Sequence, residues 1–342
     1  MMDTLSEEIY EEYRQDKTGL WKALEEHQEV PPQEELKHLS GLLNDEIQRF
    51  REAWDEMSQD AHRRLVRRLQ KLAEDDFAMD FSAIFRIAIN DRDVVVRTIA
   101  ITGLDEVDDP RLVDEFSRIL RHDASSLVRM AAARGLARFV LLGELQKINR
   151  SPFQAAMTAL LEAYHDADEE LQVRRHAVEA MAYTGTRNVP EIIQEAYEHP
   201  EQEMRISAVL AMGRSADTRW ADIVMDELRN PTPEMRFEAI RACGELQLRE
   251  AAQDIIDLTE DVDLGIKTIS LWSLGQIGGR KARKTLERHV DADNEAVQEA
   301  AQAALNELEF LYGDLTTFLG APGEFNGESD VAWDEPELPY GA

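Results

Sequence analysis

The side chains best able to do chemistry in this chain are its eight histidines and its single cysteine. No two histidines form an H-x-x-x-H pair, and none stands at metal-ligand spacing from Cys243. A zinc site needs such clustered ligands. The sequence also lacks the glycine patterns of phosphate-binding loops, dinucleotide-binding turns and nucleophile elbows. It therefore predicts no metal, no other cofactor and no catalytic residues, so we expect a protein that is not an enzyme.

The net charge of the chain argues against some classes of binding partner. Its 38 basic and 69 acidic residues give a net charge of −31. Nucleic acids and anionic membranes are bound through a positive field, so neither is expected as a partner. No apolar run is long enough for a signal peptide or a membrane helix, and one cysteine cannot build a disulfide framework. These features together favour the cytoplasm.

One short sequence pattern recurs along most of the chain. In the segment from Asn230 to Gly244, with Met235 as position 0, arginine stands at position 1 and alanine at position 4. Position 1 of the successive copies is occupied by Arg97, Arg129, Arg174, Arg205, Arg236, Lys267 and Gln298. These residues are 32 and 45 residues apart for the first two intervals and 31 residues apart thereafter. A fixed period of this length is typical of a solenoid.

Each copy of the pattern predicts a pair of helices. At about 100° per residue, positions 0, 4, 5 and 8 fall on one side of a helix, and they are apolar or small in nearly every copy. Position 4 is small throughout, which lets helices approach closely: Ala100, Ala132, Ala177, Ala208, Ala239, Ser270 and Ala301. A second run with helical apolar spacing precedes each such helix, as in Asp109 to Leu120. The unit is therefore an antiparallel helix pair, and neighbouring units must stack to bury their apolar sides.

An acidic or polar residue stands six positions before each of the first six position-1 residues. The pattern D-x-x-x-x-V-R-x-x-A-x-x-x-L resembles the HEAT-repeat family, in particular the short bacterial form also found in phycobilisome lyases. The resemblance covers roughly Asp80 to Leu308 and implies an all-α superhelical solenoid of about seven helix pairs. It also implies a ladder of charged residues that links adjacent repeats. The implied ladder residues are Asp91, Arg97, Asp123, Arg129, Asp168, Arg174, Arg205, Arg236, Asp261 and Lys267.

The resemblance favours binding over catalysis. HEAT-like hydroxylases hold iron through His-Glu pairs, and no histidine here is followed by glutamate. The phycobilisome lyases raise an alternative function, an enzyme-associated module such as a bilin-lyase-like subunit or a chaperone for a cofactor protein. Because one fold serves many functions, the repeat itself does not decide between these.

The rest of the chain divides around the repeats. We expect an acidic, partly helical arm at residues 1–43, capping helices without the repeat pattern at 44–79, the solenoid at 80–309 and an acidic disordered tail at 310–342. The 14 extra residues fall near Leu141 to Ser151 and form either a longer connection or an extended helix. The glycines near Gly275, Gly278 and Gly279 are interpreted as a helix stop and turn, like Gly213 and Gly244 at position 9. One basic run is interpreted as a solvated face: Arg63, Arg64, Arg67, Arg68 and Lys71.

Positions 2, 3 and 6 of the repeat lie opposite the buried side and should line the exposed, concave face. In three adjacent repeats they are largely apolar, which is typical of an interaction site. These candidate partner-binding residues are Ile206, Leu210, Phe237, Arg241, Ile269 and Trp272. Burial between curved repeats is the alternative interpretation of the same residues. We expect a scaffold or adaptor, with a monomer favoured, that binds a helix or an extended peptide of a protein partner.

The tail carries a further aromatic and acidic motif, DVAWDEPELPY, which contains Trp333 and Tyr340. Two interpretations stay open for it. The tail either occupies the apolar face of the same chain or remains solvated.

Overall fold

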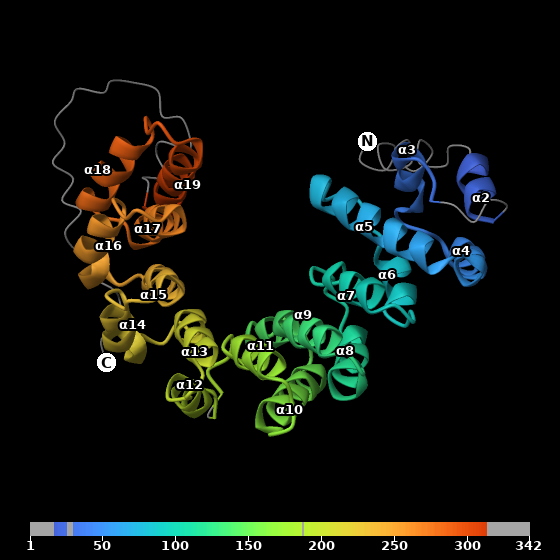
Figure 1. The fold of residues 1–342 in the computed structure, drawn as a ribbon, viewed down its shortest axis with the longest axis horizontal. Coiled ribbons are helices and arrows are strands. Elements are labelled where there is room, and N and C mark those ends of the chain that lie inside the picture. Colours follow the sequence, from blue (N-terminus) through green and yellow to red (C-terminus); the bar gives the residue numbers. More distant parts are fainter. Residues whose placement is uncertain (1–16, 26–29, 187, 313–342) are drawn as a thin grey trace. The chain divides into compact units, whose positions relative to one another are not determined.

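The computed structural model describes residues 17–25, 30–186 and 188–312. Every regular element in these residues is helical, and no strand occurs among them. The chain forms two compact units that divide between Met181 and Ala182 (Figure 1). Trp333 and Tyr340 of the tail motif lie outside the described residues. Each unit is described by itself below.

The first unit contains a short helical segment followed by four helix pairs. Its elements are α2 (Thr18–Glu25), α3 (Gln33–Leu36), η1 (Lys37–Leu39), α4 (Asn44–Glu56), α5 (Gln59–Asp75), α6 (Ser82–Ala88), α7 (Val94–Thr102), α8 (Arg111–His122), α9 (Ser126–Glu144), α10 (Arg150–His165) and α11 (Leu171–Met181). The second helices of successive pairs pack against one another, α5 on α7, α7 on α9 and α9 on α11. This stacking is that of an α-solenoid.

The second unit repeats the same arrangement four more times. Its elements are α12 (Val189–Tyr197), α13 (Gln202–Arg214), η2 (Thr218–Trp220), α14 (Ala221–Glu227), α15 (Pro233–Glu245), η3 (Arg249–Ala251), α16 (Ala252–Leu258), α17 (Leu264–Ile277), α18 (Arg280–His289) and α19 (Glu295–Tyr312). Here too the second helices stack in order, α13 on α15, α15 on α17 and α17 on α19.

The buried side of each second helix agrees with the repeat pattern. Positions 0 and 4 are buried in all seven copies, and Ala208 and Ala239 are fully buried. Position 5 is buried in six copies and exposed at Gln302, the polar exception in the last repeat. Small position-4 residues thus lie where one helix meets the next, which is why bulkier side chains are absent there.

The pair formed by α4 and α5 follows the repeat pattern as well, although its sequence was expected to lack it. With Ala61 as position 0, the residues at positions 4, 5 and 8 are Leu65, Val66 and Leu69, and all four are fully buried. His62 takes the place of the usual arginine at position 1. His62 at position 1, and Leu65 at position 4 where the other copies have a small residue, hid the pattern in the sequence.

The extra residues between Arg129 and Arg174 lengthen helices. The helix α9 runs for 19 residues and is the longest second helix described, and α10 runs for 16 residues and is the longest first helix described. Of the two forms considered for this insertion, the extended helix is the one observed. Gly143 allows the two long helices to meet, since a Cβ atom there would lie 2.2 Å from Phe153.

The glycines at position 9 are not helix stops, contrary to the expectation. Gly213, Gly244 and Gly275 lie inside α13, α15 and α17, and each closely faces the next second helix along the chain. A Cβ atom on Gly213 would lie 2.7 Å from Ala242 Cα, and one on Gly275 would lie 2.8 Å from Ala304 O. The helix α17 ends at Gly278, as expected of that glycine, and its φ of 73° suits glycine. Position 9 therefore sets how closely adjacent repeats pack.

We expect Gly275→Ala to lower the free energy of unfolding by about 1–2 kcal/mol, because overpacking outweighs the gain of about 1 kcal/mol in helix propensity. The added Cβ atom would meet backbone atoms of Ala304, which cannot rotate away. Urea denaturation measures the change. Gly185→Ala is the matched control, since nothing lies within 4 Å of a Cβ atom at Gly185. Equal midpoints for Gly275→Ala and the parent protein would show that α17 and α19 are not in close contact.

Candidate partner-binding face

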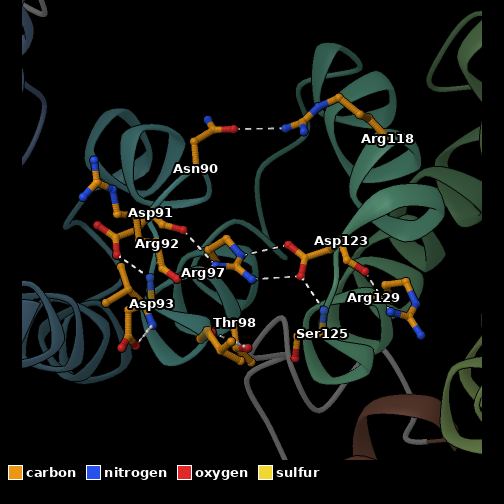
Figure 2. A network of polar contacts seen from close by, with 12 residues as sticks. Asn90, Asp91, Arg92, Asp93, Arg97, Thr98, Arg118, Asp123, Ser125 and Arg129 are labelled. Carbon is orange, nitrogen blue, oxygen red and sulfur yellow. Dashed lines mark hydrogen bonds and ion pairs between the residues drawn. The ribbon is translucent and has the colours of Figure 1, made fainter.

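The charged ladder fixes the second helices of the first unit. Arg97 on α7 donates through Nε and Nη2 to the carboxylate of Asp123 in the next repeat, at 2.8 and 2.9 Å (Figure 2). Its Nη1 donates to the backbone oxygens of Asp91 and Arg92, at 2.8 and 3.0 Å. One guanidinium thus joins the turn before its own helix to the turn of the following repeat. This is the contact expected of a ladder residue.

The next rung uses a different acid from the one expected. Arg129 donates to both carboxylate oxygens of Glu169, at 2.8 and 2.7 Å, while its Nη1 donates to Asp123 O at 2.8 Å. Asp168, the predicted partner, uses its backbone N–H in the turn with Asp166. Arg174 donates to Tyr164 O at 2.9 Å and lies over the Tyr164 ring. The assignment of Asp168 to the ladder was therefore wrong by one residue.

In the second unit the ladder is weaker. Arg205 and Arg236 each donate to the backbone oxygen six residues earlier, at 2.8 and 3.0 Å. The Arg236 guanidinium lies 3.6 Å from Asp261. Lys267 forms no ion pair within the described part of the chain. The rung expected at Lys267 is therefore absent there, and a lysine cannot supply the planar, two-pronged contact of arginine.

A further rung, at His62, was missed in the sequence. His62 Nε2 lies 2.8 Å from Trp54 O, and Nδ1 lies 2.7 Å from Asp91 Oδ2. The imidazole also stacks on Trp54, with ring centroids 3.8 Å apart. It therefore links the first helix pair to Asp91 of the next, as arginine does elsewhere.

The predicted apolar residues come from three helices that pack side by side, α13, α15 and α17. Ile206, Phe237, Ile269 and Trp272 are each partly exposed. Leu210 is only 9% exposed, which corrects its assignment to the solvent-facing set. We call the four partly exposed residues the apolar stripe. Packing between repeats therefore buries Leu210, whereas the other predicted residues stay partly accessible to solvent.

Trp272 is held against the neighbouring helix. A Cβ atom on Gly244 of α15 would lie 2.9 Å from the Trp272 ring, so the indole covers this glycine. One side of the ring packs on the backbone of α15 and part of it stays exposed. A large aromatic surface with few rotamers to freeze suits the centre of a binding site.

Charged residues border the apolar stripe on α15. Arg241, the remaining predicted residue, lies 3.7 Å from Glu238 and donates to Glu245 at 3.2 Å. Burial raises the pKa of Glu245, against the opposing charges of Arg241 and Arg214. Its Oε2 atom is buried and accepts no hydrogen bond from the described residues. This cluster gives the apolar stripe a polar rim.

The first unit has polar features of a different kind, away from positions 2, 3 and 6 of its repeats. Asp105 lies against Gly135 of α9, and burial raises the pKa of Asp105 to about 7, opposed by the charge of Arg134. Two polar hollows of about 400 and 270 Å³ lie beside the ladder and share Asn90 and Asp91. Neither hollow includes a predicted partner-binding residue. Arg118 Nη2 donates a hydrogen bond to Asn90 Oδ1 there, at 3.0 Å (Figure 2).

Groups suited to chemistry are scarce among the described residues. No cluster of three or more His, Cys, Asp or Glu side chains able to hold a metal ion occurs in them. Burial raises the pKa of the Cys243 thiol to about 12, so this buried group stays protonated at neutral pH. None of the helices described is long and apolar enough to cross a bilayer.

Comparison with known proteins identifies the repeat. The HEAT-repeat profile matches residues 81–166 and 221–306, just over half of the chain. The complex of CpcE and CpcF of phycocyanin lyase from Nostoc sp. is similar in fold, with a TM-score of 0.50 and 19% identity over 70% of this chain and 91% of that chain. Two other structures are more distant.

The Escherichia coli protein YibA gives a TM-score of 0.43 and 15% identity over 81% of this chain and 95% of its own. Importin beta gives a TM-score of 0.45 and 12% identity, over 86% of this chain and 47% of that chain. No curated protein sequence matched. The stacked helix pairs, the arginine ladder and the matching profile agree, and the chain belongs to the HEAT-repeat family.

Proposed function

We propose that this protein is a non-enzymatic scaffold that binds a helix or an extended peptide of a protein partner on the second helices of its second unit. The observation that carries the proposal is the apolar stripe. Isolated exposed apolar residues are common, but Ile206, Phe237, Ile269 and Trp272 lie on three helices that pack side by side. Partly exposed apolar side chains gathered on adjacent helices are typical of an interaction site.

The size and surroundings of the stripe fit a peptide-sized partner. Adjacent helices lie about 8–10 Å apart, so three of them offer a surface of roughly 20–30 Å. That length accommodates about four to five turns of a helix. Phe237 and Trp272 supply the aromatic anchors, while Glu238, Arg241 and Glu245 supply polar groups that orient a ligand. Binding by an apolar helix side in a groove follows this division of roles.

The proposal predicts that Phe237→Ala combined with Trp272→Ala weakens partner binding by about 2 kcal/mol or more, about 30-fold in Kd. Proteins captured by the full chain would be identified, and each purified candidate titrated by calorimetry. Circular dichroism would verify that both variants keep their helices. Phe77→Ala is the control, because Phe77 is 97% exposed and belongs to the first unit, whereas the apolar stripe belongs to the second.

A partner that binds the double variant as tightly as the parent would refute the site. A separate measurement addresses the alternative function. An open-chain bilin mixed with the parent protein should leave its own absorption spectrum unchanged. A shifted spectrum that is lost in the double variant would instead favour the lyase-like function for the same surface.

A further inference from the structure

Some basic side chains of α5 have ion-pair or hydrogen-bond partners and others have no ion pair within the described residues. Arg63 pairs with Asp93, and Arg68 donates to Pro31 O at 3.0 Å. Arg64, Arg67 and Lys71 are exposed, and no acid within the described residues forms an ion pair with them. Their spacing of three and four residues places them along one side of the helix. We call these three residues the basic stripe.

The basic stripe lies on the same side of its helix as the apolar stripe does on the helices of the second unit. In the pattern that starts at Ala61, Arg64, Arg67 and Lys71 occupy positions 3, 6 and 10. The apolar stripe of the second unit uses positions 2, 3 and 6. Next to α5, the helix α7 presents Thr98 and Ile99, which carry no charge and are partly exposed. The first unit therefore offers a positive strip beside a neutral, partly apolar one.

A segment of the same chain has the matching composition. Residues 3–13, DTLSEEIYEEY, contain five acidic residues and no basic one. The acids Glu8, Glu11 and Glu12 follow helical spacing, and Leu5, Ile9 and Tyr13 recur every four residues. We propose that residues 3–13 dock on the basic stripe of α5, with their acids toward Arg64, Arg67 and Lys71 and their apolar side chains toward Ile99.

The attachment of α2 brings this segment within reach. Lys17 pairs with Glu46 of α4 at 2.7 Å, and Arg49 of α4 bonds Glu25 and lies over Trp21, at 4.5 Å from its ring centre. The helix α2 is thus held on α4, which is paired with α5. Two helix spacings amount to about 20 Å. The chain from Glu8 to Lys17 spans up to about 30 Å when extended, which is sufficient.

Electrostatics favour this occupant over a separate acidic protein. The net charge of −31 opposes the approach of a free acidic chain. A tethered segment instead acts at an effective concentration in the millimolar range. The segment of residues 313–342, which is acidic in composition, follows α19 in the other unit. Residues 3–13 precede α2 in the same unit as α5.

The test is a distance measurement between two spin labels in the full chain. Cys243 is the only cysteine, so Cys243→Ala gives a background in which introduced cysteines are labelled specifically. The labels are placed at Ser6→Cys and at Glu74→Cys, near the end of α5. Double electron–electron resonance should give a narrow distance distribution that broadens at high salt, since surface charges are then screened.

Reversing either set of charges should abolish the narrow distribution, and reversing both should restore it. The acidic set is Glu7→Lys, Glu8→Lys, Glu11→Lys and Glu12→Lys. The basic set is Arg64→Glu, Arg67→Glu and Lys71→Glu. A control set reverses three exposed cations of α18 and should leave the distribution unchanged: Arg280→Glu, Lys281→Glu and Lys284→Glu.

Three results would overturn the docking proposal. These are a broad distribution in the parent, a narrow one that survives reversal of the basic set, and equal broadening by the control set. Circular dichroism of each variant verifies that the exposed substitutions leave the helices folded. None of these readouts depends on the apolar stripe of the other unit.

Discussion

Ala239→Glu should unfold the repeats around α15. Ala239 is fully buried where α15 meets its neighbours, so the new carboxylate would enter a close helix contact without a partner. Large losses, roughly 4–5 kcal/mol, are typical when an unpaired charge is buried. Because a solenoid is stabilised by contacts between neighbouring repeats, α13 and α17 should lose protection together with α15.

Hydrogen exchange measured by mass spectrometry on peptides from α13, α15 and α17 reports this loss directly. Ala303→Glu is the matched control, because Ala303 lies on α19, also a second helix, but is exposed. It should leave exchange unchanged. Native protection of α15 in Ala239→Glu would mean that position 4 does not face the adjacent repeat.

Arg97→Met should destabilise α7 and α9 by about 3 kcal/mol, because removing one partner of a nearly buried ion pair leaves the other charge uncompensated. The Arg97 and Asp123 side chains are only 13% and 11% exposed. The substitution also removes both hydrogen bonds from Nη1 to the turn before α7. Local exchange of α7 and α9 measures the change.

A second substitution separates the charge from the packing. Adding Asp123→Asn to Arg97→Met removes the uncompensated charge, while the Asn side-chain oxygen can still accept from Ser125 N–H. We therefore expect the double variant to regain part of the lost stability. Arg236→Met should cost less than Arg97→Met, since Arg236 lies 3.6 Å from Asp261. Similar losses in both variants would contradict the difference between the two rungs.

The repeat sequence predicted the helix pairs and their buried sides because helical periodicity is a local property. Val96, Ala100 and Ile101 show this in α7, where positions 0, 4 and 5 are all fully buried. The resemblance to the HEAT-repeat family implied a ladder that includes Arg97 and Asp123, and these two residues do pair across adjacent repeats. The rung does not recur unchanged, since Arg129 pairs with Glu169 and Arg205 donates to backbone oxygens.

The choice between Asp168 and Glu169 depended on tertiary structure. The two residues are adjacent in the turn before α11, and only its conformation selects which carboxylate reaches Arg129. His62 was missed for a related reason, since an imidazole that lies between Trp54 and Asp91 replaces a guanidinium there. A sequence pattern defined by residue type does not detect such an equivalence.

The sequence by itself determined which residues face away from each helix's buried side, and tertiary packing decided which of those are accessible. Ile206 and Leu210 both lie on the predicted side of α13, yet only Ile206 stays partly exposed. The distance between repeats makes this difference. Gly213 and Gly244 bring α13, α15 and α17 close together, and such contacts depend on residues about 30 positions apart in the chain. Helical spacing defines a direction within one helix, whereas exposure depends on how near the next helix lies.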